Sequence, residues 1–369
     1  MSDLYIGLMS GTSLDGLDAV LADFSGPRCQ VLRHHALGFD PDLRSELLAL
    51  NTSGADELHR AALAANALAR CYAQAVQALL QAADIPASAV QAIGAHGQTV
   101  RHRPGAFDGT GYTLQLNNPA LLAECTGIRV VADLRSRDVA AGGQGAPLVP
   151  AFHQFQFGQP GQDALVLNIG GIANLSVLRA DGSVLGFDCG PGNALMDHWC
   201  QQHRGEPFDR DGAWAASGQV LPALLQQMQA EPYLHQSPPK STGRDLFNPS
   251  WLEQYLRHCP SASAADVQAT LLELTASACA ESAMRYQNNS ILLAVCGGGA
   301  FNGRLMARLQ ALLPNLRVQP TDTLGLPAQQ VEAAAFAWLA RQCLLGLPGN
   351  LPSATGAQGA RVLGAIYPA

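Results

Sequence analysis

The chain has 369 residues, enough for about two domains of ordinary size. Apolar residues make up 48% and charged residues 14% of it, and this composition excludes an intrinsically disordered protein. The net charge of -7 and the isoelectric point near 5.8 argue against a nucleic acid or an anionic membrane as a partner of the whole surface. We therefore expect a globular protein that binds any anionic ligand locally.

Cysteine usage and hydropathy indicate a cytoplasmic protein. The nine cysteines are scattered and no two are spaced as C-x-x-C, which is typical of reduced thiols. The N-terminus lacks the basic and apolar regions of a signal peptide. The apolar run 291–296 stops at three glycines, and no stretch approaches the roughly 18 apolar residues that cross a bilayer. The sequence therefore predicts neither export nor a membrane span.

Strand and helix patterns alternate along the chain, which favours an α/β architecture. In the first half we expect strands at residues 4–9, 18–24 and 30–39, a long amphipathic helix over 56–83, and strands at 92–95, 112–116 and 129–132. Ser53 is the expected N-cap of the long helix. A Gly-rich loop at 142–147 then opens a helix that runs towards Phe157.

Residues 157–163 are rich in Gly, Gln and Pro and form the expected domain boundary. We expect an N-terminal domain of residues 1–157, which the C-terminal segment could also join, and a C-terminal domain of residues 158–369. The second domain repeats the opening pattern of the chain, with strands at 164–169, 174–178 and 184–188. It continues with an exposed loop at 237–248, a strand at 290–296, and helices at 266–285, 303–313 and 331–345.

Three Gly-rich turns, each after an expected strand, are the main functional signal: residues 10–18, 168–174 and 296–302. Glycines there allow a phosphate to approach the backbone closely, although each turn alone is more often a tight hairpin or a helix start. The chain has no G-x-x-x-x-G-K-[ST], no G-x-G-x-x-G after a strand, no H-E-x-x-H and no G-x-S-x-G. These absences argue against P-loop, dehydrogenase, zincin and α/β-hydrolase chemistry.

Two hairpin turns about one domain apart and a late strand-GGG-helix turn form the layout of the actin, Hsp70 and sugar kinase superfamily, which this sequence resembles. Six blocks narrow the resemblance to the anhydro-N-acetylmuramic acid kinases of bacterial cell-wall recycling. They are GLMSGTSLDGLD at 7–18, GAHGQT at 94–99, DVAAGGQGAPLVP at 138–150, NIGG at 168–171, GFDCGPGN at 186–193 and CGGGAFN at 296–302. Together they cover nearly the whole chain and are far more specific than the superfamily layout, which leaves the substrate open.

The resemblance implies an α/β fold of the two-domain, actin-like ATPase (ribonuclease H-like) type, with the active site in the interdomain cleft. It also implies a reaction in which ATP phosphorylates O6 of 1,6-anhydro-N-acetylmuramic acid while water opens the anhydro bridge. The products are N-acetylmuramic acid 6-phosphate and ADP, within peptidoglycan recycling and amino-sugar catabolism. The ATP- and phosphate-binding residues that the matching motifs imply are Gly11, Thr12, Ser13, Leu14, Asp15, Gly16, Leu17, Asp18, Asn168, Gly170, Gly171, Asn174, Gly297, Gly298, Gly299 and Asn302.

Asp188 is the candidate catalytic base. It ends an apolar strand, and the turn at 190–193 then leads into a helix, which would present the carboxylate at a sheet edge. The reaction needs a carboxylate that takes a proton from the water attacking the anomeric carbon. On spacing alone Asp188 could equally cap the turn that follows it, and the family resemblance favours catalysis.

The candidate substrate-binding residues are polar and lie in or near the matching motifs: His96, Gln98, Thr99, Arg135 and Glu332. The first three lie in a Gly-flanked loop after a short strand, where they could contact sugar hydroxyls or the lactyl group. Arg135 could hold the substrate carboxylate, or belong with Arg137 and Asp138 to a solvated charge run. Glu332 could accept from a sugar amide or hydroxyl, or simply stabilise the N-terminus of the last helix.

Mg²⁺ is expected with ATP because phosphoryl transfer needs charge neutralisation. The strand before the first turn lacks the Asp that sugar kinases and actin usually carry there, so no direct ligand is assigned and Asp15 and Asp18 are candidates only. The alternatives are an ordinary sugar kinase that opens no ring and an actin- or Hsp70-like ATPase without a metabolic role. A homodimer is implied by the resemblance alone.

Overall fold

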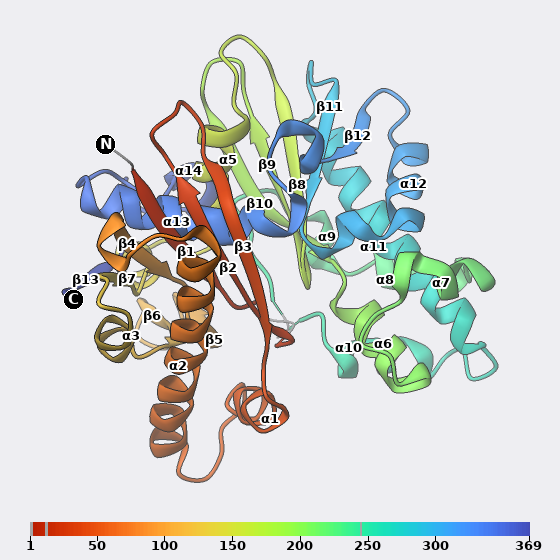
Figure 1. Cartoon of the computed structure of the whole chain (residues 1–369). Helices are drawn as coiled ribbons and strands as arrows, with labels where there is room; N and C mark the ends of the chain where they lie inside the picture. The colour runs from red at the N-terminus through yellow and green to blue at the C-terminus, as the bar shows by residue number, and fades with distance from the viewer. Residues whose placement is uncertain (1–2, 12–13, 244–245) are drawn as a thin grey trace. The chain divides into compact units, whose positions relative to one another are not determined.

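The computed structural model describes residues 3–11, 14–243 and 246–369 (Figure 1). It divides into two compact units, one of Met1–Gln156 with Gln330–Ala369 and one of Phe157–Gln329. The first break falls at the start of the stretch that is rich in Gly, Gln and Pro. Residues 330–369, which the sequence analysis placed in the C-terminal domain, pack in the first unit, the alternative that it had left open.

A six-stranded sheet forms the centre of the first unit, in the order β13-β7-β4-β1-β2-β3. Its strands are β1 (Leu4–Met9), β2 (Gly16–Asp23), β3 (Gln30–Gly38), β4 (Val90–Ala95), β7 (Val130–Ala132) and β13 (Ala365–Tyr367). The first three strands form an antiparallel meander, whereas β4 runs parallel to both β1 and β7. The C-terminal strand β13 closes the edge by pairing antiparallel with β7.

Helices cover both faces of this sheet. The helices of this part of the chain are α1 (Pro41–Ala49), α2 (Glu57–Ala83), α3 (Pro119–Thr126), α4 (Ser136–Ala140), α5 (Val149–Phe157), α13 (Val331–Leu344) and α14 (Pro352–Thr355). Because side chains alternate along a strand, Ile6 and Leu8 of β1 join the core under α2. On the opposite face Gly7 lies directly under Ala333 of α13.

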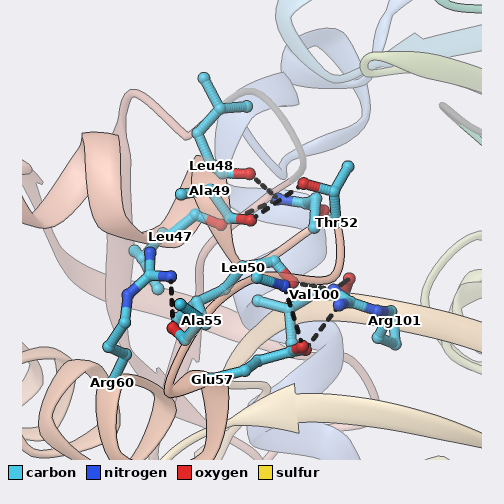
Figure 2. Close-up of polar contacts among 12 residues, drawn as sticks. Leu47, Leu48, Ala49, Leu50, Thr52, Ala55, Glu57, Arg60, Val100 and Arg101 are labelled. Atoms are coloured by element: carbon cyan, nitrogen blue, oxygen red, sulfur yellow. Dashed lines mark hydrogen bonds and ion pairs between the residues drawn. The ribbon is translucent and has the colours of Figure 1, made fainter.

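The hairpin of β5 (Gln98–Pro104) and β6 (Gly111–Leu116) forms a separate two-stranded sheet in this unit. Figure 2 shows how Arg101 of β5 holds the connection between α1 and α2. Its guanidinium donates to the main-chain oxygen of Leu50 and to the carboxylate of Glu57. The hairpin that carries Gln98 and Thr99 is therefore anchored to the helical layer.

A five-stranded sheet in the order β10-β9-β8-β11-β12 forms the centre of the second unit. Its strands are β8 (Ala164–Ile169), β9 (Ile172–Leu178), β10 (Val184–Pro191), β11 (Leu292–Cys296) and β12 (Arg317–Pro320). The helices of this unit are α6 (Ala194–Arg204), α7 (Ala213–Ser217), α8 (Pro222–Gln229), α9 (Pro232–His235), α10 (Pro249–Leu256), α11 (Ala264–Tyr286) and α12 (Gly303–Leu312). Leu165 and Leu167 of the central strand share a core with Leu271 and Leu274 of α11, so α11 packs on one face of the sheet.

Several expected elements differ from the structure. Six helices that were not expected from the sequence begin with Pro at the first helical position, namely α1, α3, α8, α9, α10 and α14. Proline is tolerated at this position because its missing N–H costs no hydrogen bond there. The strands β5, β12 and β13 were also not expected, and Gln98 and Thr99 lie in β5 rather than in a loop.

Three boundaries also need correction. The N-cap of α2 is Asp56, in a left-handed conformation, and not Ser53. The strand β2 begins at Gly16, so the expected turn at 10–18 is shorter than predicted. The expected exposed loop at 237–248 contains Lys240, which is buried, and the helix α10 begins at Pro249 directly after it.

The close packing of α13 on β4 predicts that Gly94 tolerates no side chain. A Cβ at Gly94 would overlap the main chain of Phe336 and lie 3.0 Å from the Cβ of Ala340. We expect Gly94→Ala to lower the free energy of unfolding by about 1–3 kcal/mol, as overpacking does. Urea denaturation measures it, with Gly38→Ala of β3 as the control, because a Cβ there meets only Asp15 O at 3.7 Å. Equal stability of the two variants would contradict this packing.

Candidate functional site

A row of four side chains crosses the sheet of the second unit. The strand register pairs Cys296 of β11 with Asn168 of β8, Asn168 with Asn174 of β9, and Asn174 with Asp188 of β10. Paired residues on neighbouring strands point to the same face, which here is the face opposite the core under α11. Cys296 Sγ lies 3.7 Å from Asn168 Oδ1, in keeping with that register. The predicted base and two predicted phosphate-loop residues therefore lie in one line.

Asp188 is held from both its main chain and its side chain. Its carboxylate oxygen Oδ2 accepts from Thr242 N at 2.9 Å, and its side chain and main chain together are only 7% exposed. Its N–H donates to Lys240 O, and its carbonyl oxygen accepts from the Tyr233 hydroxyl at 3.0 Å. Burial and the charge of Asp188 raise the pKa of Tyr233, so this phenol stays protonated and keeps donating. A buried, oriented carboxylate of this kind suits proton transfer.

The glycine turns of the second unit flank that row. Gly170 and Gly171 form the half-buried turn between β8 and β9, and the Asn193 side chain braces it by donating to Ile169 O. Gly297, with φ of +77°, ends β11 and leads into the 3₁₀ turn Gly298–Phe301. A side chain at Gly297 would meet the Asn168 side chain, which only glycine avoids.

Asn302, another predicted nucleotide-binding residue, stabilises the start of a helix. Its side chain caps α12 by accepting from Leu305 N, and Gly303 N donates to Asp211. Two main-chain donors at this helix N-terminus are thus satisfied within the chain. In contrast, the Oδ1 atom of Asn174 is buried and has no hydrogen-bond partner among the described residues. It is therefore an acceptor that a ligand could satisfy.

The first Gly-rich turn lies in the other unit, and its predicted residues Thr12 and Ser13 fall outside the described part of the chain. Gly11 is half-buried, Leu14 is buried in a left-handed conformation, and Asp15 is exposed. The residues Gly16, Leu17 and Asp18 belong to β2. There Leu17 joins the hydrophobic core, and the Asp18 carboxylate pairs with His34 Nε2 at 2.7 Å.

Buried His96 and half-buried Arg135 form a pair in the first unit. The Arg135 guanidinium donates to His96 Nε2 through Nε at 3.0 Å and Nη2 at 2.9 Å, so this ring nitrogen must be an acceptor. The other nitrogen, Nδ1, then carries the proton and donates to Ser10 O at 3.2 Å. Burial and, second, the Arg135 charge hold the pKa of His96 well below its usual value. Both ring nitrogens are thus engaged within the chain, and the ring positions the guanidinium.

The other predicted substrate residues of this unit lie in β5 and α13. Gln98 is 1% exposed, donates to Gly11 O at 3.1 Å, and leaves its buried Oε1 atom without a partner among the described residues. The hydroxyl of Thr99 accepts from Gln115 at 3.1 Å. Glu332 is half-buried in the first turn of α13.

Two charged residues near the predicted site residues are buried. Asp138 is fully buried, not solvated, and its carboxylate accepts from Gly145 N, the Asn350 amide and the Thr355 hydroxyl. These bonds anchor the loop whose Gly145 carbonyl binds Arg135. Lys240, which was expected in an exposed loop, is 6% exposed, and its main-chain oxygen accepts from Asp188 N. The sequence offered one sign that Lys240 is unusual, because it is the only lysine among the 22 Lys and Arg residues of the chain.

The whole chain matches known proteins. A family model described as anhydro-N-acetylmuramic acid kinase covers residues 3–369. The anhydro-N-acetylmuramic acid kinase of Variovorax paradoxus (strain S110) is 64% identical over 372 residues, which cover 100% of this chain and 99% of that protein. The chain belongs to the anhydro-N-acetylmuramic acid kinase family. The protein of that name from Pseudomonas putida (strain KT2440) is 55% identical over 99% of both chains.

Among solved structures, component A of the (R)-2-hydroxyglutaryl-CoA dehydratase of Acidaminococcus fermentans aligns with a TM-score of 0.47 and 11% identity, over 91% of this chain and 96% of that one. Membership of the anhydro-N-acetylmuramic acid kinase family thus rests on the sequence comparisons. The chain is accordingly a phosphotransferase. In the described residues no helix is long and apolar enough to cross a membrane.

The buried histidines predict how stability depends on pH. Burial lowers the pKa of His153 to about 3, and His96 is also depressed in pKa, whereas an unfolded histidine takes up its proton near pH 6.5. Below that pH the unfolded state binds more protons than the folded state, so the free energy of unfolding decreases as the pH is lowered. Between pH 7 and 5.5 each of these histidines should cost about 1 kcal/mol of unfolding free energy.

Urea unfolding at the two pH values measures this cost. The variant His96→Gln can still donate to Ser10 O and accept from Arg135. Between pH 7 and 5.5 we expect its free energy of unfolding to decrease by about 1 kcal/mol less than that of the unmutated protein. The control is His258→Gln, at an exposed position, which should match the parent. Equal pH dependence of all three proteins would contradict a neutral, buried His96.

Proposed function

We propose that this kinase uses ATP to phosphorylate O6 of 1,6-anhydro-N-acetylmuramic acid while water opens the anhydro bridge. Water forms a bond to the anomeric carbon C1, and the bond between C1 and the bridge oxygen breaks. That oxygen, now O6, bonds to the γ-phosphorus, and the bond from the γ-phosphorus to the β,γ-bridging oxygen breaks. The products are N-acetylmuramic acid 6-phosphate and ADP, so the enzyme serves cell-wall recycling and amino-sugar catabolism.

Asp188 takes the proton from the attacking water. The support is its buried carboxylate, held by Thr242 N at 2.9 Å at the end of the row that includes Asn168 and Asn174. Fixing a base in this way keeps it in line for a single direction of attack, which is how positioning lowers a barrier. This orientation is the single observation that carries the mechanism.

Substrate binding falls to the polar groups of the first unit. The Arg135 guanidinium, oriented by neutral His96, suits the lactyl carboxylate of the substrate. The buried Oε1 of Gln98 is an acceptor that a sugar hydroxyl would satisfy. Thr99 and Glu332 are further candidates, for a hydroxyl and for the N-acetyl amide respectively. His96 itself acts by holding Arg135, because both of its ring nitrogens are engaged.

The Gly-rich turns at 11–18, 168–174 and 297–302 bind ATP through their main chain. The Leu14 and Leu17 side chains belong to the core, so these residues offer backbone groups only. Asp18 pairs with His34 and is a weaker candidate for a metal ligand than Asp15, which is exposed.

Mg²⁺ accompanies the nucleotide and supplies charge neutralisation at the phosphates. The described residues contain no group of three or more His, Cys, Asp or Glu that could hold a metal ion. Mg²⁺ in phosphotransferases binds mainly to substrate phosphates and water, with one or two carboxylates. The residues present therefore fit an ion that ATP carries in, with Asn174 Oδ1 or the carboxylate of Asp15 as the candidate protein oxygen.

We place the enzyme in the cytoplasm as a homodimer. All nine cysteines are free thiols, and six of them are buried without a disulfide between them, as in a reducing compartment. The dimer rests on the family resemblance.

Replacing the base tests its role. Asp188→Asn keeps the shape and can still accept from Thr242 N, but cannot take a proton at neutral pH. We expect kcat to fall about 10²- to 10⁴-fold, with the substrate KM changed little. Steady-state kinetics measure both, and circular dichroism verifies the fold. The control is Asp181→Asn, in an exposed turn of the same unit. Near-normal kcat of Asp188→Asn would contradict its role as the base.

The reaction itself is tested with heavy-oxygen water. Incubation with Mg-ATP and 1,6-anhydro-N-acetylmuramic acid should give a phosphorylated sugar that carries one heavy oxygen at the anomeric carbon, seen by mass spectrometry. Phosphate on an intact anhydro ring would instead indicate an ordinary sugar kinase. ATP hydrolysis without a sugar product would point to an actin- or Hsp70-like ATPase, which sedimentation of polymer would then examine.

A further inference from the structure

Lys240 is the only lysine in a chain that otherwise uses arginine for its basic residues. It is also buried, with 6% of its surface exposed. Burying a charged side chain costs free energy unless it is well paired. The ammonium of Lys240 must therefore find partners within the protein that offset this cost.

The contacts of Lys240 suit a compact ammonium. Its Nζ donates to Tyr233 O and Leu234 O, both at 3.2 Å. It also lies 4.7 Å from the ring centre of Tyr233 and 5.9 Å from that of Phe187. A planar guanidinium places its donors in a rigid fork, whereas an ammonium can direct its protons to two carbonyls on one side and a ring on the other.

The same residues hold Asp188. Lys240 O accepts from Asp188 N at 3.2 Å, and the Tyr233 hydroxyl donates to Asp188 O at 3.0 Å. Two residues beyond Lys240, Thr242 N donates to the Asp188 carboxylate. The Lys240 ammonium thus links α9 to the loop that follows it, and both segments form hydrogen bonds to Asp188.

These hydrogen bonds take the place of a second neighbouring strand beside β10. In the five-stranded sheet β10 is an edge strand, so only β9 pairs with it. The register between them also shifts between Asp188 and Gly190. The sheet alone therefore leaves Asp188 at an edge and beside a bulge, where backbone position is set by other contacts.

We propose that Lys240 is a positioning residue for the Asp188 carboxylate, an inference that rests on Asp188 acting as the base. Its ammonium locks Tyr233 and Leu234 to the loop, and the loop orients the carboxylate through Thr242 N. Lys240 touches no reacting atom. Its removal changes the rate of the chemical step while leaving substrate binding to other residues.

Two variants and a matched control test this. Lys240→Met keeps a long, packable side chain but removes the ammonium, and we expect kcat to fall about 100-fold with KM within about threefold of the parent. Lys240→Arg keeps the charge but not the ammonium geometry, and we expect it to lose kcat as well. The control is Arg285→Met, which removes an exposed positive charge lining the same pocket as Lys240. It should keep the parent kcat.

Melting temperature separates positioning from stability. The proposal expects Lys240→Met to lose kcat without a matching loss of melting temperature, because a buried charge is replaced by an apolar side chain. A parent-like kcat in either Lys240 variant overturns the proposal. So does a loss of kcat that Arg285→Met shares, or one that a lowered melting temperature accounts for.

A spectroscopic measurement on the unmutated lysine holds even where a Lys240 variant does not fold. Growth with lysine carrying ¹³C at the ε position labels one residue, so the protein gives one ε-methylene signal in NMR. We expect that signal to differ from free lysine and to shift in Asp188→Asn, because the two residues share the loop. A signal at the free-lysine position, or one unchanged in Asp188→Asn, overturns the proposal.

The kinetics of Asp188→Asn, measured in the same series, keep the two ideas apart. If Asp188→Asn retains the parent kcat, the assignment of the base fails whatever the Lys240 variants do. If Asp188→Asn loses kcat and both Lys240 variants retain it, only the positioning role fails.

Discussion

The alternation of side chains across a β-strand governs the second unit. Leu165, Leu167 and Leu175 point to one face of the five-stranded sheet and are buried under α11. Residues that alternate with these core positions along each strand must then point to the other face, and the strand register brings Asn168, Asn174 and Asp188 into line there. The polar row is thus a consequence of the apolar core. A shift of one residue in β10 would bury the carboxylate under the helices and expose Phe187.

In the first unit the corresponding constraint is close backbone contact. Gly7 and Gly94 allow α13 to lie directly on β1 and β4, where any side chain would overlap its main chain. That contact brings residues far apart in the sequence together. Phe336 of α13 packs against the His96 ring at 4.6 Å between ring centres, and His96 in turn orients Arg135. The C-terminal segment therefore supports the predicted substrate-binding residues as well as the sheet.

Buried charges in both units are held by main-chain groups. Asp138 accepts from Gly145 N, Asp188 accepts from Thr242 N, and Lys240 donates to the carbonyls of Tyr233 and Leu234. Each such bond links a loop to a strand or helix. The link is strong because a buried charge that loses its partner costs several kcal/mol. Charged side chains that look suited to solvent in the sequence thus fix the loops beside the proposed site.

The sequence by itself determined the α/β class, the meanders that open both units and the family, because these depend on local periodicity and on motifs whose residues are adjacent in the chain. It also identified Asp188 and the Gly-rich turns as candidates. Helices that begin with proline escaped it, since a proline at a first helical position reads locally as a turn. Only the tertiary structure decided that Asp138 and Lys240 are buried, that His96 is neutral and oriented towards Arg135, and that residues 330–369 pack in the first unit. Each of these depends on partners tens to hundreds of residues away, such as Asn350 for Asp138, and no local pattern encodes that distance.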